Sequence, residues 1–315
     1  MRQLSLSITK TPWEVAKYST KLTNTTRIAL LFIAFMSILS WFYYYSENLT
    51  LAYNDARSHL NISRRVVDSL QPGLAQLGTV WLPLQHVLQL PTIWVDYLYH
   101  SGISGSLISI LAFILSSYIL AKIARVLGFS DFQSVLLLVV FSLNPNLLYM
   151  QTSPMTESLL IFTLVFSTYY LLLWEKTGSI GHLIIAAFGV FLAVLARYDG
   201  WFFYLYALVA VFLVSLLKSG FRRASANVVL FGAIPGFAVF LWLLWNQLIF
   251  GNFLEFMNGS FSAKAQQDIL LAEGRLLTKG SLAQSAYTYA LTVIENSGLL
   301  VVILGVLGVF RTIYI

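Results

Sequence analysis

Residues 27–45, RIALLFIAFMSILSWFYYY, form an apolar run, and the polar stretch 53–68, YNDARSHLNISRRVVD, follows a few residues later. A helix needs about 20 mostly apolar residues to cross the hydrocarbon core of a bilayer, and the first run has about that length. The second stretch repeats apolar residues at helical spacing between charged ones. Together they predict a membrane-spanning helix followed by an amphipathic helix on the membrane surface.

The composition places the chain among membrane proteins. Hydrophobic residues make up 58% of its 315 residues and charged residues 10%, whereas about a quarter of the residues of soluble proteins are charged. The net charge of +6 comes from Lys and Arg scattered between apolar runs, so we expect membrane topology to explain it and no nucleic-acid partner. The absence of cysteine excludes disulfides, thiolate metal sites and cysteine nucleophiles.

Further apolar runs predict an all-α polytopic fold with about eight transmembrane helices. The runs lie near residues 27–45, 103–124, 133–150, 157–174, 181–197, 200–217, 226–250 and 286–310. The polar stretch 1–26 lacks the features of a signal peptide and is predicted to be a cytoplasmic tail. Residues 27–315 are predicted to form one transmembrane domain.

Lys and Arg set the predicted orientation, because short cytoplasmic connections carry an excess of them. They gather before the first run and after the second, fourth and sixth, which predicts a cytoplasmic N terminus. The opposite connections include the long segments 46–102 and 251–285 and hold most of the acids. We expect a multi-pass protein of a prokaryotic plasma membrane with these two segments outside.

Four predicted outer connections bring polar residues to one side, where a single site could be assembled from them. Glu157, Arg197 and Asp199 stand at the ends of apolar runs, where a charge is costly to bury without a partner or a purpose. The alternative is that all four connections are ordinary solvated loops.

The stretch 53–68 supplies the first candidate residues. At about 100° per residue, Asp55 and His59 fall within the apolar sector and are predicted to point toward the bundle. The apolar face comprises Ala56, Leu60, Ile62, Val66, Val67 and Leu70, and the wet face comprises Arg57, Asn61, Arg64, Arg65 and Asp68. Alternatively, Asn54 or Asp55 is the N-cap, and the Asp55 carboxylate only satisfies backbone amides of the first turn. Arg64 and Asp68 are predicted to form a surface pair.

Prolines shape the segment that follows. Pro83 and Pro91 make an uninterrupted span there unfavourable, so we expect short interfacial helices, with Trp81 and Trp94 at the headgroup boundary. His86 is predicted to make a structural polar contact.

Two further charged positions each have two interpretations. Glu157 either occupies the favourable N terminus of a helix or faces Asp55 as a second carboxylate, where the two could share Mg²⁺ or Mn²⁺. Arg197 and Asp199 either pair with each other or leave Arg197 to hold a phosphate through its guanidinium. Lys264 is a weaker phosphate candidate, and Asn246 could bind hydroxyl groups of a polar substrate.

An Asp soon after the first span, on an amphipathic outer helix, followed by an acid beside the second outer loop and by many spans, resembles the class C glycosyltransferase superfamily. The stretch NDARSHLNISRRVVDSLQPGLAQLGTVWLPLQHVL is similar to the first outer loop of these membrane enzymes, which include protein O-mannosyltransferases and aminoarabinose transferases. MTES and ARYDGW are similar to their later landmarks. The resemblance extends over residues 27–285 of this sequence.

The resemblance implies inverting transfer of a sugar from a polyprenyl-phosphate donor to a lipid, glycan or protein acceptor outside the membrane. Asp55 would be the general base, and Glu157 would support it or a metal. Arg197 or Lys264 would stabilise the leaving phosphate. The substrate-binding set would comprise His59, Arg57, Arg197, Asp199, Asn246 and Lys264.

The chain departs from the family pattern in two respects. Ala56 follows Asp55 where some relatives carry paired acids, which leaves metal dependence open. The chain also ends soon after the eighth run, as a compact core or a truncated form would. The alternative functions are a transporter or lipid flippase, which usually places charges at mid-depth in its spans, and a non-catalytic assembly subunit.

Overall fold

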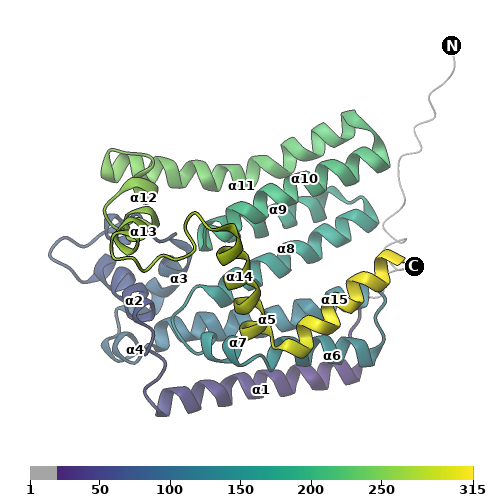
Figure 1. Cartoon of the computed structure of the whole chain (residues 1–315), viewed down its shortest axis with the longest axis horizontal. Helices are drawn as coiled ribbons and strands as arrows, with labels where there is room; N and C mark the ends of the chain where they lie inside the picture. The colour runs from purple at the N-terminus through teal and green to yellow at the C-terminus, as the bar shows by residue number, and fades with distance from the viewer. Residues whose placement is uncertain (1–19, 315) are drawn as a thin grey trace. The chain divides into compact units, whose positions relative to one another are not determined.

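A computed structural model describes residues 20–314, which fold as helices joined by turns and short loops, with no strand among them (Figure 1). Residues 1–19 of the predicted cytoplasmic tail lie outside the described residues. The first helix, α1, begins at Asn24, three residues before the predicted span. The all-α prediction is confirmed for the described part of the chain.

Five helices of the described part are long and apolar enough to cross a membrane. They are α1 (Asn24–Ser46), α5 (Ile103–Val126), α8 (Glu157–Thr177), α10 (Asp199–Ser219) and α11 (Phe221–Phe250). A helix satisfies its own backbone hydrogen bonds, as a bilayer without water requires. Many apolar side chains on these helices are exposed, including Phe35 and Leu217, which suits a surface covered by lipid. The chain is an integral multi-pass membrane protein.

The prediction of eight spans was too high by this criterion. The run near 133–150 is broken into α6 (Asp131–Ser142) and α7 (Pro145–Met150). Asn144 makes the break, because its side-chain oxygen accepts hydrogen bonds from the amides of Asn146 and Leu147 and so caps α7. The run near 181–197 is α9 (Ile180–Ala196), an apolar helix of 17 residues that is shorter than each of the five candidate spans and is not counted among them.

The run near 286–310 is also broken. Helices α14 (Leu282–Ser297) and α15 (Leu299–Tyr314) meet at 107°, with Gly298 between them. Gly298 has a φ of 84°, a conformation that glycine adopts without a steric cost. If this bent pair is one span, the described residues contain six candidate spans.

Short helices occupy the two long connections, as predicted for the first of them. Segment 46–102 contains α2 (Asn54–Val67), η2 (Leu74–Leu77), α3 (Leu84–Ile93) and α4 (Asp96–His100). Segment 251–285 contains α12 (Glu255–Asn258) and α13 (Ala263–Ala272), and α14 begins within it.

The chain divides into two compact units. The first comprises residues up to Met36, Leu111–Leu138 and Leu159–Ala238, and the second comprises Ser37–Ile110, Val139–Ser158 and the chain from Val239 onward. Helices α1, α5, α6, α8 and α11 contribute residues to both.

The first unit is held together by apolar packing and a few polar links. Tyr169 and Leu173 of α8 pack with Ile119 and Val126 of α5 in a buried cluster. The Tyr204 hydroxyl donates to the carbonyl of Gly232 at 2.8 Å, which joins α10 to α11. Such interhelical bonds act where the lipid provides no hydrophobic force between helices.

Serine and glutamine side chains fix one segment of the second unit. The Ser37 hydroxyl of α1 donates to Gln151 Oε1 at 2.8 Å, and Gln151 Nε2 returns a bond to the Ser37 carbonyl at 3.1 Å. From α5, Ser106 and Ser109 donate to the carbonyls of Thr152 and Met155 at 2.7 and 3.1 Å. Residues 151–156 are therefore buried and fixed immediately before α8 begins at Glu157.

Gly105, in the first turn of α5, allows this packing. A Cβ atom at this position would clash with Cβ of Pro154, and would lie 2.8 Å from Pro154 Cα and 2.9 Å from Nε2 of Gln89. Gly105 is thus the point where α3, α5 and the segment before α8 approach one another.

We expect Gly105→Ala to destabilise the protein by about 1–3 kcal/mol, because the added methyl group has no room beside Pro154. Gly305→Ala in α15 is the matched control, since no atom lies within 4 Å of its added Cβ. The measurement is denaturant unfolding of the purified variants in one detergent. Equal stability of the two variants would contradict the packing described for Gly105.

Candidate functional site

Helix α2 is amphipathic, as predicted, and its buried face comprises Ala56, His59, Leu60, Ile62 and Ser63. His59 is 3% exposed, so its predicted inward orientation is confirmed. Val67 and Leu70 were predicted on the same face but are exposed, because the helix ends at Val67 and Asp68 has an extended backbone.

Asp55 lies in the first turn of α2 and is partly exposed. The N-cap position of this helix is Tyr53, and no side chain caps it. The alternative prediction that Asn54 or Asp55 is the N-cap is therefore wrong. Among the described residues, no hydrogen bond or ion pair ties the Asp55 carboxylate to another group. The carboxylate is therefore available to a ligand.

A pair of histidines joins α2 to α3. His59 Nδ1 and His86 Nε2 lie 2.8 Å apart in a hydrogen bond, and both rings are buried. The Trp81 ring packs beside His59, with centroids 4.6 Å apart. The prediction that His86 makes a structural polar contact is confirmed.

The buried face of α3 is more polar than the apolar sequence of this segment predicts. Gln85, His86 and Gln89 are all fully buried, and Gln89 Oε1 accepts a hydrogen bond from the Ser63 hydroxyl at 2.6 Å. Both amide atoms of Gln85, Nδ1 of His86 and Nε2 of Gln89 are buried without a hydrogen-bond partner among the described residues. Each such group costs about 1–3 kcal/mol, which stability alone does not explain. The available signal was the QHVLQ pattern, which places both glutamines on one face of an apolar helix.

Burial lowers the pKa of His86 well below its ordinary value, and the nearby positive charges of His59 and Arg65 lower it further. His86 is therefore neutral at neutral pH. A neutral imidazole carries one donor and one acceptor nitrogen, so it can bond to His59 without repulsion.

The segment before Glu157 lies close to this polar face. Gln89 of α3 and Pro154 both crowd the Cα of Gly105, as the contacts of an added Cβ show. Glu157 follows Pro154 by three residues, and His59 follows Asp55 by four. The second unit thus contains both predicted carboxylates, Asp55 and Glu157. Asp55 is on α2, which packs against α3, and Glu157 follows the segment that meets α3 at Gly105. In this segment the Ser153 hydroxyl donates to the Met150 carbonyl at 3.1 Å.

Arg64 ties α2 to the end of α3 and to α4. Its guanidinium donates to Asp68 at 2.7 Å, to Asp96 at 2.6 Å and to the carbonyls of Ile93 and Trp94 at 3.0 Å each. The predicted pair with Asp68 is confirmed, but it is one part of a larger arrangement.

The structure gives different surroundings to two other candidates of the second unit. Asn246 is fully buried; its Oδ1 accepts from the Thr79 hydroxyl, and its Nδ2 donates to the Trp242 carbonyl at 2.8 Å. This amide joins α11 to the loop before α3 and does not face solvent. Lys264, in the first turn of α13, is exposed and has no ion-pair partner among the described residues.

Arg197 and Asp199 belong to the first unit, between α9 and α10. Arg197 Nε donates to Asp199 Oδ2 at 3.1 Å, which is the pairing predicted as one of two interpretations. The backbone approaches closely at Gly200, which follows Asp199. A Cβ atom added to Gly200 would lie only 2.8 Å from the amide nitrogen of Val194. The turn between these helices is therefore tight.

No protein family, curated protein or solved structure matches this chain. The described residues contain no group of three or more His, Asp or Glu side chains placed to hold a metal ion.

Acidification should destabilise the protein through His86. Its pKa is lower in the folded than in the unfolded state, so the unfolded state binds more protons as pH falls below about 6.5. We expect stability to fall by up to about 1.4 kcal/mol per pH unit in this range and His86→Gln to reduce that slope. Unfolding at a series of pH values measures it. Between neutral and mildly alkaline pH, residue 86 takes up no proton in either protein, so the two curves of stability against pH should run parallel. Equal slopes of the two curves at acidic pH would contradict a lowered pKa of the buried His86.

Arg64→Lys should cost about 1–3 kcal/mol, because an ammonium group cannot reproduce the five directed bonds of the guanidinium. Arg65→Lys is the matched control, since Arg65 is exposed and makes no hydrogen bond among the described residues. Thermal unfolding in detergent compares them. Because both substitutions keep the positive charge, a similar effect of the two would contradict a stabilising contribution from the directed bonds of Arg64.

Proposed function

We propose that this protein is a membrane glycosyltransferase that moves a sugar from a polyprenyl-phosphate donor to a hydroxyl acceptor, with Asp55 as the general base. The observation that carries the proposal is the Asp55 carboxylate itself. It is partly exposed, has no partner among the described residues and stands at the start of an amphipathic helix that follows the first long apolar helix. This placement agrees with the family resemblance of the sequence.

In the proposed reaction, the acceptor oxygen attacks the anomeric carbon of the sugar. The bond from that carbon to the carrier phosphate oxygen breaks, and the configuration at the carbon inverts. The Asp55 carboxylate takes the proton of the acceptor hydroxyl as the new bond forms. The polyprenyl phosphate leaves as an anion.

A cation near the leaving phosphate would stabilise the developing charge. Of the two proposed candidates, Lys264 is exposed and unpaired among the described residues, whereas Arg197 is engaged with Asp199. This favours Lys264. A divalent cation held by Asp55 and Glu157 would serve the same purpose, because Mg²⁺ sites often combine one or two carboxylates with phosphate oxygens of the substrate.

The buried polar face of α3 supports the carboxylate indirectly. His59, one turn after Asp55, is held by His86, and Ser63, one turn further, is held by Gln89. These bonds fix the rotation of α2 and therefore the direction of Asp55. We propose that His59 and His86 are positioning residues for the base.

The proposal predicts that Asp55→Asn reduces sugar transfer by about 10²–10⁴-fold, the usual contribution of a general base. The measurement uses purified protein and a radiolabelled polyprenyl-phosphate hexose, with membrane lipids and membrane proteins as acceptors. Asp68→Asn is the matched control, because this exposed acid directly follows the last residue of the same helix, and the Asn amide oxygen can still accept from Arg64, so transfer should stay within about twofold.

Two results would overturn the proposal. One is wild-type protein that transfers no label from the donor to any acceptor; the other is full activity of Asp55→Asn with an unchanged unfolding midpoint. A flippase would move the intact donor across a vesicle membrane without altering it, so analysis of the lipid after incubation separates this alternative.

A further inference from the structure

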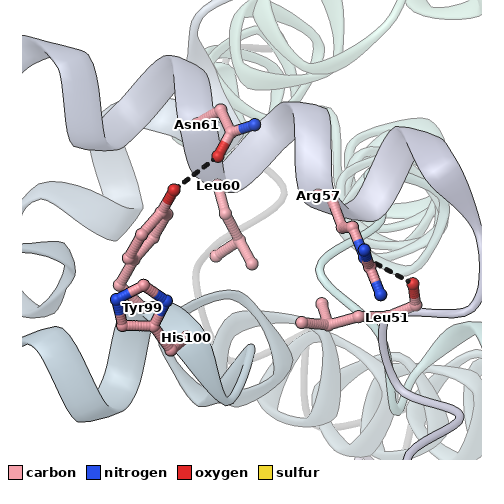
Figure 2. Close-up of a pocket in the computed structure, with 6 residues that line it drawn as sticks. All are labelled: Leu51, Arg57, Leu60, Asn61, Tyr99 and His100. Atoms are coloured by element: carbon pink, nitrogen blue, oxygen red, sulfur yellow. Dashed lines mark hydrogen bonds between the residues drawn. The ribbon is translucent and has the colours of Figure 1, made fainter.

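A pocket of about 310 Å³ lies on a different side of α2 from Asp55. It is lined by Leu51, Arg57, Leu60, Asn61, Tyr99 and His100. Figure 2 shows Arg57 and Leu51 at one end, Asn61, Tyr99 and His100 at the other, and Leu60 between them. At about 100° per residue, Arg57 stands roughly 160° around the helix from Asp55, so the pocket is separate from the proposed base.

The pocket is cationic at the Arg57 end. Arg57 Nε donates to the Leu51 carbonyl at 3.2 Å, which orients the guanidinium (Figure 2). Its two terminal nitrogens have no partner among the described residues and can donate to a ligand. A guanidinium held in this way presents a fork that matches two oxygens of a phosphate.

No acid neutralises that charge within the pocket. None of the six lining residues is acidic. Asp68, which follows α2, and Asp96 of α4 are bound to Arg64 at 2.7 and 2.6 Å. Asp55 of α2 stands on a different side of the helix from Arg57, so none of these three acids pairs with the Arg57 guanidinium.

The other end of the pocket offers hydrogen-bond donors of a neutral kind. The Tyr99 hydroxyl donates to Asn61 Oδ1 at 2.6 Å, which leaves the Asn61 amide hydrogens for a ligand. The His100 ring lies beside Tyr99, with centroids 4.7 Å apart. Such groups suit the hydroxyls of a polyol, and Leu60 supplies an apolar floor between the two ends (Figure 2).

The surroundings favour a lipid over a soluble ligand. Exposed aromatic rings occur on and beside these segments: Tyr43 of α1, Tyr53 before α2, Trp94 between α3 and α4, and Tyr97 of α4. Tyr and Trp are enriched where hydrocarbon meets the headgroups. Helix α2 is itself amphipathic, as expected of a helix at that depth.

We propose that this pocket binds the headgroup of an anionic phospholipid, with Arg57 on the phosphate and Asn61 and His100 on headgroup hydroxyls. This site does not depend on the proposed sugar transfer. It places Arg57, which the family resemblance implies is a substrate contact, on a structural lipid. A lipid bound there would bridge the turn at Leu51, α2 and α4.

The test is a binding titration of delipidated, purified protein. The vesicles consist of phosphatidylcholine alone or of an equal mixture of phosphatidylcholine and phosphatidylglycerol, and glycerol 3-phosphate and inorganic phosphate are the soluble probes. We expect preferential binding of phosphatidylglycerol, and Arg57→Gln should weaken it about tenfold or more through loss of a charge-assisted bond. Arg65→Gln, which removes the same charge from an exposed position on the same helix, should weaken it less than about twofold.

Three outcomes would overturn the proposal. Equal losses in Arg57→Gln and Arg65→Gln would indicate general surface attraction. Equal binding of the two vesicle types would exclude an anionic headgroup, and competition by glycerol 3-phosphate as strong as that by the lipid would indicate a soluble ligand.

Asp55→Asn should keep full lipid binding, so failure of the sugar-transfer proposal would leave this result unaffected. A His100→Gln variant with unchanged unfolding checks the opposite end of the pocket and should also weaken binding.

Discussion

Helix α2 is fixed by polar bonds that are shielded from water. Its His59 and Ser63 bond to His86 and Gln89 of α3, and all four side chains are buried. Hydrogen bonds in such an environment are strong, and breaking one leaves a costly unpaired group. The rotation of α2 therefore has one favourable value, which determines where Asp55 and Arg57 each face. Both proposed sites depend on this contact.

The features that the sequence predicted well are those with a local cause. The five long apolar helices follow from length and hydropathy, and α2 follows from its apolar periodicity. The errors in the predicted spans arise where a single residue interrupts a helix within an apolar run. Asn144 caps α7 and Gly298 permits a sharp bend, and a hydropathy average over a window is insensitive to either.

The polar contacts of the site were harder to predict because their partners are distant in sequence. Gln89 meets Ser63 across 26 residues, and Asn246 meets Thr79 across 167. A polar residue predicted to bind substrate can equally bind another part of the chain, as Asn246 does. The inward orientation of His59 was accessible to prediction because a helical projection needs only neighbouring residues. The relation of α3 to the segment before Glu157 needed the packing around Gly105, which no periodicity encodes.

The bonds of Arg64 have a consequence for how this region can vary. They hold the end of α3 and the start of α4 directly against α2. The exposed residues 70–72 between α2 and η2 therefore do not set the distance between these helices. Natural variants that lengthen or shorten this connection would preserve the geometry on both sides of α2. The length of this loop can therefore vary as long as the Arg64 guanidinium is retained.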